Sequence, residues 1–428
     1  MKKRLLAIVI ATFMLFSACA SGYTAELPFE AYEPTTTSIA TEPIAVINDI
    51  TSVPAVPVDT WEAISNFSQE LFLQALVADD VECENLVISP LSAYYALAMV
   101  ALGARGATLD EFAYVLGQDP SKLAPELARL ASSLMEVDGS TLLTLAGSVW
   151  ICDNYTVHPD FNQAMINYFG APAFPRNFAS RATVDEINSW ISYQTNGLID
   201  EMLEEIENDE IMFLINTLYL LTKWAEEIYP MTESVRRFTP ESGIGRDADF
   251  ISTEAVVLNA RVTDTYEAVL LPYDDGRLGF FAVRPTDGTL IRDFATMHYL
   301  ADIFAGLQRN YVIVHMPELD KEFDITMNNM LKAMGLNEAF GTFADLFGLV
   351  DMPPVGQPIE ISYVRQMVRI IVDKEGTEAA AATIVSVARQ SSRPEPLPIV
   401  LDFNTPYIYA IYDLNTGIPL FIGIVDYP

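Results

Sequence analysis

The residue types that most often do chemistry form no recognisable catalytic pattern in this sequence. The three histidines, His158, His298 and His315, are far apart, and there is no His-Glu-x-x-His zinc motif, Gly-x-Ser-x-Gly turn or Walker phosphate loop. Acidic pairs such as Glu204-Glu205 are frequent in a chain with 58 Asp and Glu, so no pair stands out as a general acid and base. We therefore predict no enzyme, no catalytic residue, no metal site and no cofactor.

Residues 373–390, DKEGTEAAAATIVSVARQ, have the most unusual pattern in the chain. Glu378–Ala382 has high helix propensity, whereas Thr383–Val387 favours a strand. Three prolines follow within 391–398. We interpret this region as an exposed loop, and conflict between its two halves is typical of a functional site. The alternative is an ordinary helix followed by a Pro-rich loop.

Charge and composition exclude several classes of protein. The chain has 24 Lys and Arg against 58 Asp and Glu, a net charge of −34, so it repels phosphates, and we expect no nucleic-acid partner. Apolar residues make up 51%, which indicates a globular protein. Three cysteines are too few for a disulfide scaffold. We interpret Cys83 and Cys152 as buried free thiols, with a disulfide between them left open.

The N-terminus has the pattern of a targeting segment. Lys2, Lys3 and Arg4 precede an apolar run, Leu5–Phe16, that is too short to span a bilayer. Phe16-Ser17-Ala18-Cys19 is similar to a bacterial lipobox. Residues 1–18 are therefore predicted to be a lipoprotein-type signal peptide, with a lipid on Cys19 that holds a secreted protein at the outer face of a bacterial cell membrane. The alternative is an ordinary secretory signal cleaved nearby.

The rest of the chain divides into a tether and one domain. Residues 19–58 are rich in Pro, Thr and acidic residues, without periodicity, which predicts a flexible tether. Residues 59–428 contain no linker-like break and no internal repeat, so we expect one domain there.

Helix patterns dominate the first third of that domain, and strand patterns dominate later. Trp61, Ile64, Phe67 and Leu71 recur at helical spacing. We further expect helices over residues 92–102 and 187–203, and a capping box at Thr108 and Glu111. Runs typical of strands are 211–221, 256–262, 268–273, 279–283, 311–316, 399–403, 407–412 and 420–425. The sequence therefore predicts a mixed α+β fold, with a hairpin turn at Asp274-Asp275-Gly276.

Residues 376–383, Gly-Thr-Glu-Ala-Ala-Ala-Ala-Thr, resemble the hinge of the reactive-centre loop of serpins. Other serpin-like motifs follow in the family's order over residues 60–428: Asn85–Ser92, Leu102–Thr108, Asn216–Tyr219, Lys223-Trp224, Leu271–Tyr273, Met334–Leu336, Ala344–Leu346 and Pro406–Gly423. The resemblance implies a single serpin-type α+β domain. Its N-terminal part would be helix-rich, with a large central mixed β-sheet, further sheets and an exposed reactive-centre loop at about 374–398.

The resemblance also implies a function and a set of site residues. The function is suicide inhibition of a serine endopeptidase, whose acyl-enzyme is trapped when the cut loop inserts into the central sheet. The hinge would be Gly376, Thr377, Glu378, Ala379, Ala380, Ala381, Ala382 and Thr383. The shutter and breach of the sheet would be Ser89, Ser92, Asn216, Trp224 and Gln366, with Gln366 where the family often has His.

Strand alternation predicts which loop residues face the core after insertion. The inward set is Thr377, Ala379, Ala381, Thr383, Val385 and Val387. None of these is charged, whereas Glu378 falls on the outward face. This pattern favours an inhibitor over the alternative, a non-inhibitory serpin-like binding protein whose loop is only a protease substrate. A third class, a structural surface protein, would not require uncharged residues at these inward positions.

Counting along the loop as in the family places the reactive bond at Gln390-Ser391. Arg389-Gln390, one place earlier, offers the side chain that trypsin-like pockets prefer. Cleavage after Val387 or Ala388 would suit an elastase-like pocket. We therefore expect a monomer whose partner is a trypsin-like, elastase-like or subtilisin-like serine protease, and whose membrane attachment is only through Cys19.

Overall fold

The computed structural model describes residues 58–78, 85–136, 140–170, 172–207, 210–228, 231–351, 359–377 and 397–428. The predictions for residues 1–57, for Cys83 and for loop residues 378–396 lie outside this set. The division into signal, tether and domain stays a prediction. None of the helices that the structure describes is both long and apolar enough to cross a bilayer.

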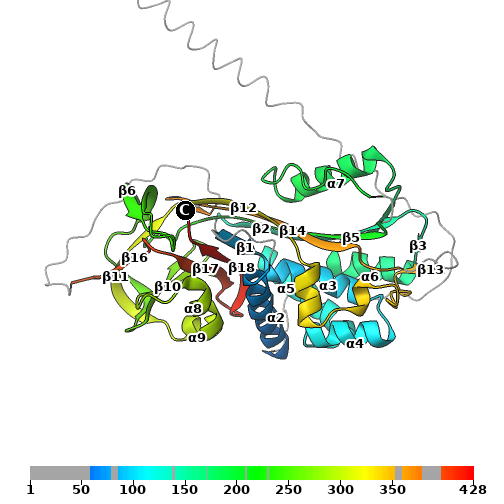
Figure 1. Cartoon of the computed structure of the whole chain (residues 1–428), viewed down its shortest axis with the longest axis horizontal. Coiled ribbons are helices and arrows are strands. Elements are labelled where there is room, and N and C mark those ends of the chain that lie inside the picture. Colours follow the sequence, from blue (N-terminus) through cyan, green and yellow to red (C-terminus); the bar gives the residue numbers. More distant parts are fainter. Residues whose placement is uncertain are drawn as a thin grey trace, which may run out of the picture. The chain divides into compact units, whose positions relative to one another are not determined.

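The described helices occur mainly in the first half of the domain (Figure 1). They are α2 (Val58–Leu76), α3 (Pro90–Ala101), α4 (Gly106–Val115), α5 (Pro120–Met135), α6 (Pro159–Phe169), α7 (Arg181–Gln194), α8 (Ile291–Met297), α9 (Leu300–Ala305), α10 (Asn328–Met334) and a 3₁₀ turn (Glu338–Phe340).

The described strands form two large sheets and one small one. They are β1 (Asn85–Ile88), β2 (Leu142–Cys152), β3 (Thr156–Val157), β4 (Ala173–Arg176), β5 (Met212–Lys223), β6 (Thr232–Phe238), β7 (Arg246–Ser252), β8 (Val256–Val262), β9 (Tyr266–Pro272), β10 (Leu278–Pro285), β11 (Gln308–Pro317), β12 (Leu319–Thr326), β13 (Val350–Asp351), β14 (Tyr363–Val372), β15 (Gly376–Thr377), β16 (Ile399–Asp402), β17 (Tyr407–Asp413) and β18 (Ile418–Val425).

The strand order separates a ten-stranded sheet from a six-stranded one. The ten-stranded sheet has the order β1-β18-β17-β10-β9-β8-β11-β7-β6, with β16 paired to β11. The six-stranded sheet has the order β12-β14-β15-β5-β2-β4. It is mixed, because β2 pairs with β4 in parallel and with β5 antiparallel. The remaining two strands, β3 and β13, pair with each other.

Helix α3 connects the two sheets through the core. All of its residues, PLSAYYALAMVA, are buried, and none is charged. A helix that is apolar on every side belongs in a protein interior. It contacts β18 of the ten-stranded sheet and both β2 and β5 of the six-stranded sheet. Figure 1 shows α3 and α5 on one face of the six-stranded sheet and α7 on the other.

Strand β14 shows how the six-stranded sheet is covered. Its residues alternate between half-buried and fully buried along its whole length, as a strand with one core face requires. On the half-buried face, the Arg369 guanidinium donates to the backbone carbonyl of Leu198, in the segment that follows α7. The segment after α7 therefore lies against the face of the sheet opposite the core.

The strand predictions agree with the structure, and β8 matches residue for residue. The predicted hairpin turn at Asp274-Asp275-Gly276 is confirmed, with Gly276 at φ 67°. The helix predicted over 187–203 is too long, because α7 ends at Gln194. Asn196 and Gly197 then take left-handed φ values of 52° and 79°, which stop a helix.

The predicted capping box at Thr108 and Glu111 is wrong. Helix α4 begins earlier, at Gly106, so both side chains lie inside the helix. The Thr108 hydroxyl accepts a hydrogen bond from the backbone N–H of Asp345 at 2.9 Å. The Glu111 carboxylate accepts two more, from the N–H groups of residues 337 and 338 at 2.7 Å each. These polar side chains therefore bind a distant loop instead of their own helix end.

Candidate functional site: an opening in the six-stranded sheet

Strands β5 and β14 are paired at one end of the six-stranded sheet and separated at the other. At the paired end they run in parallel register from Phe213↔Tyr363 to Ile215↔Arg365. At the other end β15 lies between them, antiparallel to both. Residues 216–221 of β5 and 366–371 of β14 lie between these ends without pairing to each other, and we call this region the opening. Its geometry fits one additional short strand.

The hinge pair, Gly376 and Thr377, closes the end of the opening that lies opposite the parallel pairs. We call this the upper end, and the end next to the parallel pairs the lower end. Gly376 pairs with Lys223, and Thr377 pairs with Thr222 on β5 and with Val372 on β14. A Cβ atom on Gly376 would lie 2.0 Å from the carbonyl oxygen of Thr222, so only glycine fits at this approach. Thr377 is 3% exposed, which places its side chain on the core face as strand alternation predicts.

Two stacked aromatic residues hold the hinge by hydrogen bonds. The rings of Trp224 and Tyr273 stack with their centroids 4.9 Å apart. The Tyr273 hydroxyl lies 2.6 Å from the Thr377 hydroxyl, and the Trp224 indole N–H donates to the carbonyl of Asp373 at 2.8 Å. Burial raises the pKa of Tyr273 far above its ordinary value, so this group remains a neutral hydroxyl. The hinge is therefore fixed by both side-chain and backbone bonds.

A compact network of three polar side chains lies at the lower end of the opening. The Gln366 side chain accepts from the N–H of Ser89 at 2.8 Å and donates to its carbonyl at 2.9 Å. Gln366 also donates to the Ser92 hydroxyl at 2.7 Å. The Ser89 hydroxyl donates to the carbonyl of Leu420 in β18 at 2.8 Å. These bonds connect β14 to the start of α3 and to the other sheet, and all three side chains are buried.

Asn216 is buried at the same end but is not part of that network. It is 4% exposed, and neither its amide nitrogen nor its amide oxygen has a hydrogen-bond partner. Its neighbours are tightly packed, since a Cβ atom on Gly147 would lie 3.2 Å from the amide nitrogen and 2.0 Å from the Met99 methyl. An unpaired buried polar group costs about 1–3 kcal/mol and calls for an explanation.

The structure thus brings the predicted residues together at two ends of one feature. Trp224 lies with the hinge pair at the upper end, and Ser89, Ser92, Asn216 and Gln366 lie at the lower end. The remaining hinge residues, Glu378, Ala379, Ala380, Ala381, Ala382 and Thr383, and the bond residues Arg389, Gln390 and Ser391 lie outside the described residues.

Sequence reasoning missed the hinge partners Tyr273 and Thr222 as site residues. Tyr273 directly precedes the Asp-Asp-Gly turn, where a large aromatic side chain next to a polar turn is a usable signal of local anchoring. Thr222 lies near the end of β5 and carries no such signal. In the part of the chain that the structure describes, no group of three or more His, Cys, Asp or Glu side chains could hold a metal ion.

A family model described as serpin (serine protease inhibitor) matches residues 62–428. The chain belongs to the serpin family. Serpin-Z3 of Arabidopsis thaliana is 27% identical, over 84% of this chain and 96% of its own length. The native-state structure of the thermophilic serpin tengpin is 28% identical with a TM-score of 0.79, and the match covers 88% of this chain and 96% of tengpin.

A more distant serpin shows how widely the fold is used. Human thyroxine-binding globulin, solved with thyroxine bound, is 20% identical with a TM-score of 0.76, and the match covers 87% of this chain and 99% of that protein. At this identity the likeness shows the fold alone. For the serpin described here, family membership confirms the predicted α+β serpin fold, within a family that consists typically of protease inhibitors.

Proposed function

We propose that this serpin is a suicide inhibitor of serine endopeptidases and that the opening receives its cleaved reactive-centre loop. The observation that carries the proposal is the position of the hinge pair. Gly376 and Thr377 already occupy the upper end of the opening as a short strand antiparallel to both β5 and β14. Among the described residues, no strand pairs with the facing edges of β5 and β14 between Thr377 and the parallel pairs, so a chain that continues in the register of Thr377 would run antiparallel to both.

The chemical step belongs to the target protease. Its serine oxygen bonds to the carbonyl carbon of the attacked loop residue, and the peptide C–N bond breaks. The new amine takes a proton from the protease's general base and leaves as the N-terminus of the downstream segment. The inhibitor then has to act before water hydrolyses the acyl-enzyme, and it does so by moving the N-terminal part of the loop into the sheet and distorting the protease.

The two observed registers define where each loop residue would go. If the pairing of Thr377 with Thr222 and with Val372 continues, residues 378–383 fill the opening against 216–221 and 366–371. Thr383 then lies opposite Asn216 on one side and opposite Gln366 on the other. It falls on the same face as Thr377, so its hydroxyl would point at the unpaired Asn216 amide.

Insertion beyond Thr383 requires a further change in the sheet. The next loop positions would face residues 213–215 and 363–365, which pair with each other in the uncleaved protein. These parallel pairs must separate to admit the strand. Each is replaced by two antiparallel contacts, and antiparallel pairing is slightly more stable per residue than parallel pairing. The exchange therefore favours full insertion.

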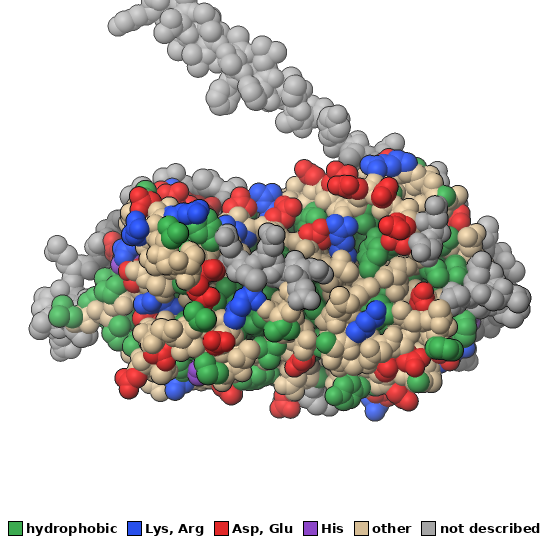
Figure 2. Space-filling view, in the orientation of Figure 1, with side chains coloured by type: hydrophobic (Ala, Val, Ile, Leu, Met, Phe, Trp, Pro, Cys, Tyr) green, Lys and Arg blue, Asp and Glu red, His purple; other side chains and the backbone are tan. Residues whose placement is uncertain are grey.

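The target is a serine protease whose specificity follows the reactive bond. Gln390-Ser391 is the first candidate bond and Arg389-Gln390 is the runner-up, which would select a trypsin-like protease. Cleavage after Val387 or Ala388 would select an elastase-like one, and subtilisin-like enzymes form the third class to test. Acidic and basic side chains are interspersed over the face seen in Figure 2. With a net charge of −34, the chain as a whole disfavours a polyanionic activator.

The proposed function is tested by adding the serpin to proteases whose concentration of active sites is known. Increasing amounts of the serpin should abolish the activity of at least one trypsin-like, elastase-like or subtilisin-like enzyme at a fixed molar ratio, without recovery after dilution. Activity that persists while the loop is cleaved would reject inhibition. That result would favour the alternative, a non-inhibitory binding protein whose loop is only a substrate.

We further propose that the mature protein is secreted and held at the outer face of a bacterial cell membrane by a lipid on Cys19. One acyl chain contributes about 0.8 kcal/mol per buried CH₂ group, so stable attachment needs more than one chain. Metabolic labelling with a fatty acid should mark the native chain and not Cys19→Ala. Equal labelling of both would reject the lipid anchor and leave an ordinary secretory signal.

A further inference from the structure

The hairpin turn between β9 and β10, residues 273–277, lies directly beside the hinge pair and is tied to the structure on several sides. Tyr273 forms its first residue and carries the hydroxyl that meets Thr377. Its backbone is held to β5, because the N–H of Asp274 donates to the carbonyl of Lys223 at 2.9 Å. Small movements of this turn would therefore move the groups that hold the hinge.

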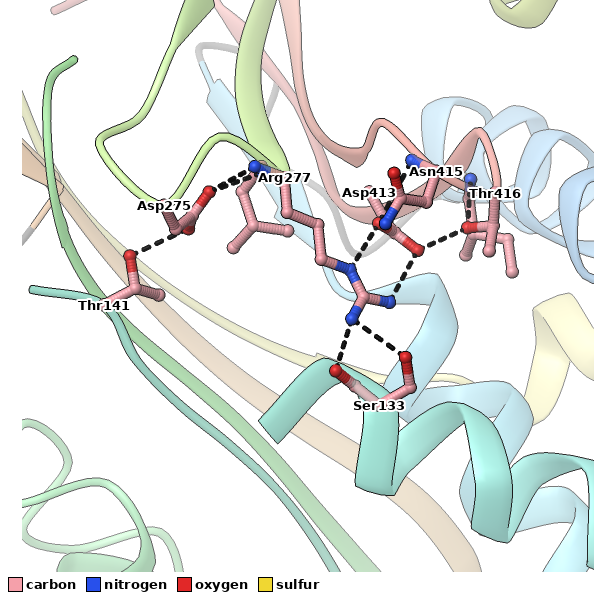
Figure 3. Close-up of polar contacts among 9 residues, drawn as sticks. Ser133, Thr141, Asp275, Arg277, Asp413, Asn415 and Thr416 are labelled. Carbon is pink, nitrogen blue, oxygen red and sulfur yellow. Dashed lines mark hydrogen bonds and ion pairs between the residues drawn. The ribbon is translucent and has the colours of Figure 1, made fainter. Parts of the chain in front are cut away.

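A buried ion pair fixes the other side of the turn. The Arg277 guanidinium donates to both carboxylate oxygens of Asp413, at 2.8 and 3.1 Å, as Figure 3 shows. It also donates to the carbonyl and the hydroxyl of Ser133 at the end of α5. The side chain of Asp413 is fully buried and that of Arg277 is 14% exposed. Thr416 donates to Asp413 at 2.7 Å and completes the cluster.

A second set of bonds runs from the turn to the strand that pairs with the hinge. The Asp275 carboxylate accepts from the backbone N–H groups of Arg277 and Leu278 at 2.7 Å each. It also accepts from the Thr141 hydroxyl at 2.8 Å (Figure 3). The Thr141 hydroxyl lies 2.5 Å from that of Thr222, the register partner of Thr377. The turn thus reaches the hinge through both Tyr273 and Thr222.

We infer that this turn is a clamp that keeps the hinge pair seated in the sheet, and that Arg277 and Asp413 are the positioning residues that set it. A bidentate Arg–carboxylate pair fixes both distance and orientation, which a single hydrogen bond cannot do. A buried ion pair also resists partial displacement, because either charge left alone in the interior is strongly unfavourable. The consequence for trapping rests on the proposed function: a seated hinge lets insertion start from a strand already formed.

Arg277→Lys separates a positioning role from a merely stabilising one. Lysine keeps the charge opposite Asp413 but loses the planar fork, so the protein still folds while the turn is held less rigidly. The matched control is Arg284→Lys in β10, the strand that follows the turn. The Arg284 guanidinium pairs with Glu267 at 2.6 Å, their side chains are 17% and 9% exposed, and neither residue contacts the hinge pair in the described structure.

Amide hydrogen exchange of the hinge peptide in the uncleaved full-length protein is the readout. Arg277→Lys should speed exchange at residues 376–377 about five-fold, the effect of weakening one hydrogen bond, whereas Arg284→Lys should leave it unchanged. Equal hinge exchange in the two variants would overturn the inference. A change in hinge exchange that only scales with the fall in melting temperature would also overturn the inference, because a purely structural role of Arg277 produces that result.

Thr141→Val provides a second test of the same proposal. It removes the contacts of Thr141 with Asp275 and Thr222 and leaves the ion pair intact, so it should also speed hinge exchange. Combined with Arg277→Lys it should add little, because both act through the turn. If the two effects on the hinge exchange rate multiply fully in the double variant, the proposed route through the turn is wrong. If hinge exchange behaves as expected but no protease is trapped, the clamp stands and the proposed function fails.

Discussion

The hydroxyl groups of Tyr273 and Thr377 lie 2.6 Å apart in the interior, with the two residues 1% and 3% exposed. This contact fixes the side-chain face and the register of the first loop residue in the sheet. Every later loop position is then determined by counting, because strand faces alternate and both neighbouring strands have known partners.

Replacing Thr377 with Arg should turn the inhibitor into a substrate. The guanidinium would have to enter the site where the Tyr273 hydroxyl and the Trp224 ring now lie, and a buried unpaired charge is strongly disfavoured. The protease would still cut the loop, but insertion would fail and the enzyme would be released. Protease activity after incubation measures this, with Glu378→Arg on the outward face as control. Normal trapping by Thr377→Arg would contradict the insertion account.

Replacing Thr383 with Val should destabilise only the cleaved, inserted form. In that form the hydroxyl is expected to pair with the Asn216 amide, and its loss would leave a buried group unsatisfied again, at about 1–3 kcal/mol. Denaturant unfolding of the cleaved and uncleaved proteins measures the difference. Ser386→Ala, on the outward face, should change neither form. An equal effect on both forms in Thr383→Val would refute the register derived from the hinge pair.

Replacing Gln366 with Met should destabilise the uncleaved protein by about 2–4 kcal/mol. The change keeps the side-chain length but leaves the backbone of Ser89 and the hydroxyl of Ser92 without their present partner. The free energy of unfolding in urea is the measurement. Gln163→Met, at an exposed glutamine of α6, is the control and should have little effect. Similar values for the two variants would show that the network does not hold β14.

Glu318 should make the stability of the protein depend on pH, and the direction of its pKa shift sets the sign. Burial, helped by the carboxylates of Glu233, Asp373 and Asp249, raises the pKa of Glu318, while Lys374 opposes the shift. Folding therefore shifts the Glu318 carboxyl toward its protonated form. Its contribution to stability is present below the ordinary pKa and is lost as the pH rises through the raised pKa.

Glu318→Gln tests that sign directly. The variant should melt at a higher temperature than the native protein at pH 7, and the gain should shrink as the pH falls and disappear near pH 3, where the carboxyl is protonated in both states. Melting curves across this range are the measurement. Glu322→Gln, at an exposed position of the neighbouring β12, is the matched control for the loss of a carboxylate. A gain that is constant with pH would contradict the assignment.

The sequence predicted most of the sheet residues because their patterns are local. Apolar runs such as 256–262 need only their own composition to be identified as strands. The hinge and shutter positions came from the resemblance to serpins, and of these the structure places Gly376, Thr377 and the shutter residues around one opening. The capping box failed because Thr108 and Glu111 bind a loop more than 200 residues away, and no local pattern contains that information.

The missing parts of the site depend on contacts between distant segments. Thr222, Thr141 and Asp275 come from separate elements and meet only when the sheets are assembled. The difference between Gln366, which is fully bonded, and Asn216, which is unpaired, is equally invisible in the sequence. Both residues were assigned to the shutter by resemblance, but their different states depend on which side chains lie within hydrogen-bond distance.

The central claim is that a protease becomes covalently trapped after cutting the loop. The most direct measurement is denaturing gel electrophoresis of the serpin after incubation with trypsin-like, elastase-like and subtilisin-like proteases, followed by mass spectrometry of the products. The account predicts an SDS-stable one-to-one complex with at least one enzyme, and a released peptide that begins at Ser391 or, for the runner-up bond, at Gln390. Clean loop cleavage by every enzyme, with no covalent complex, would contradict it.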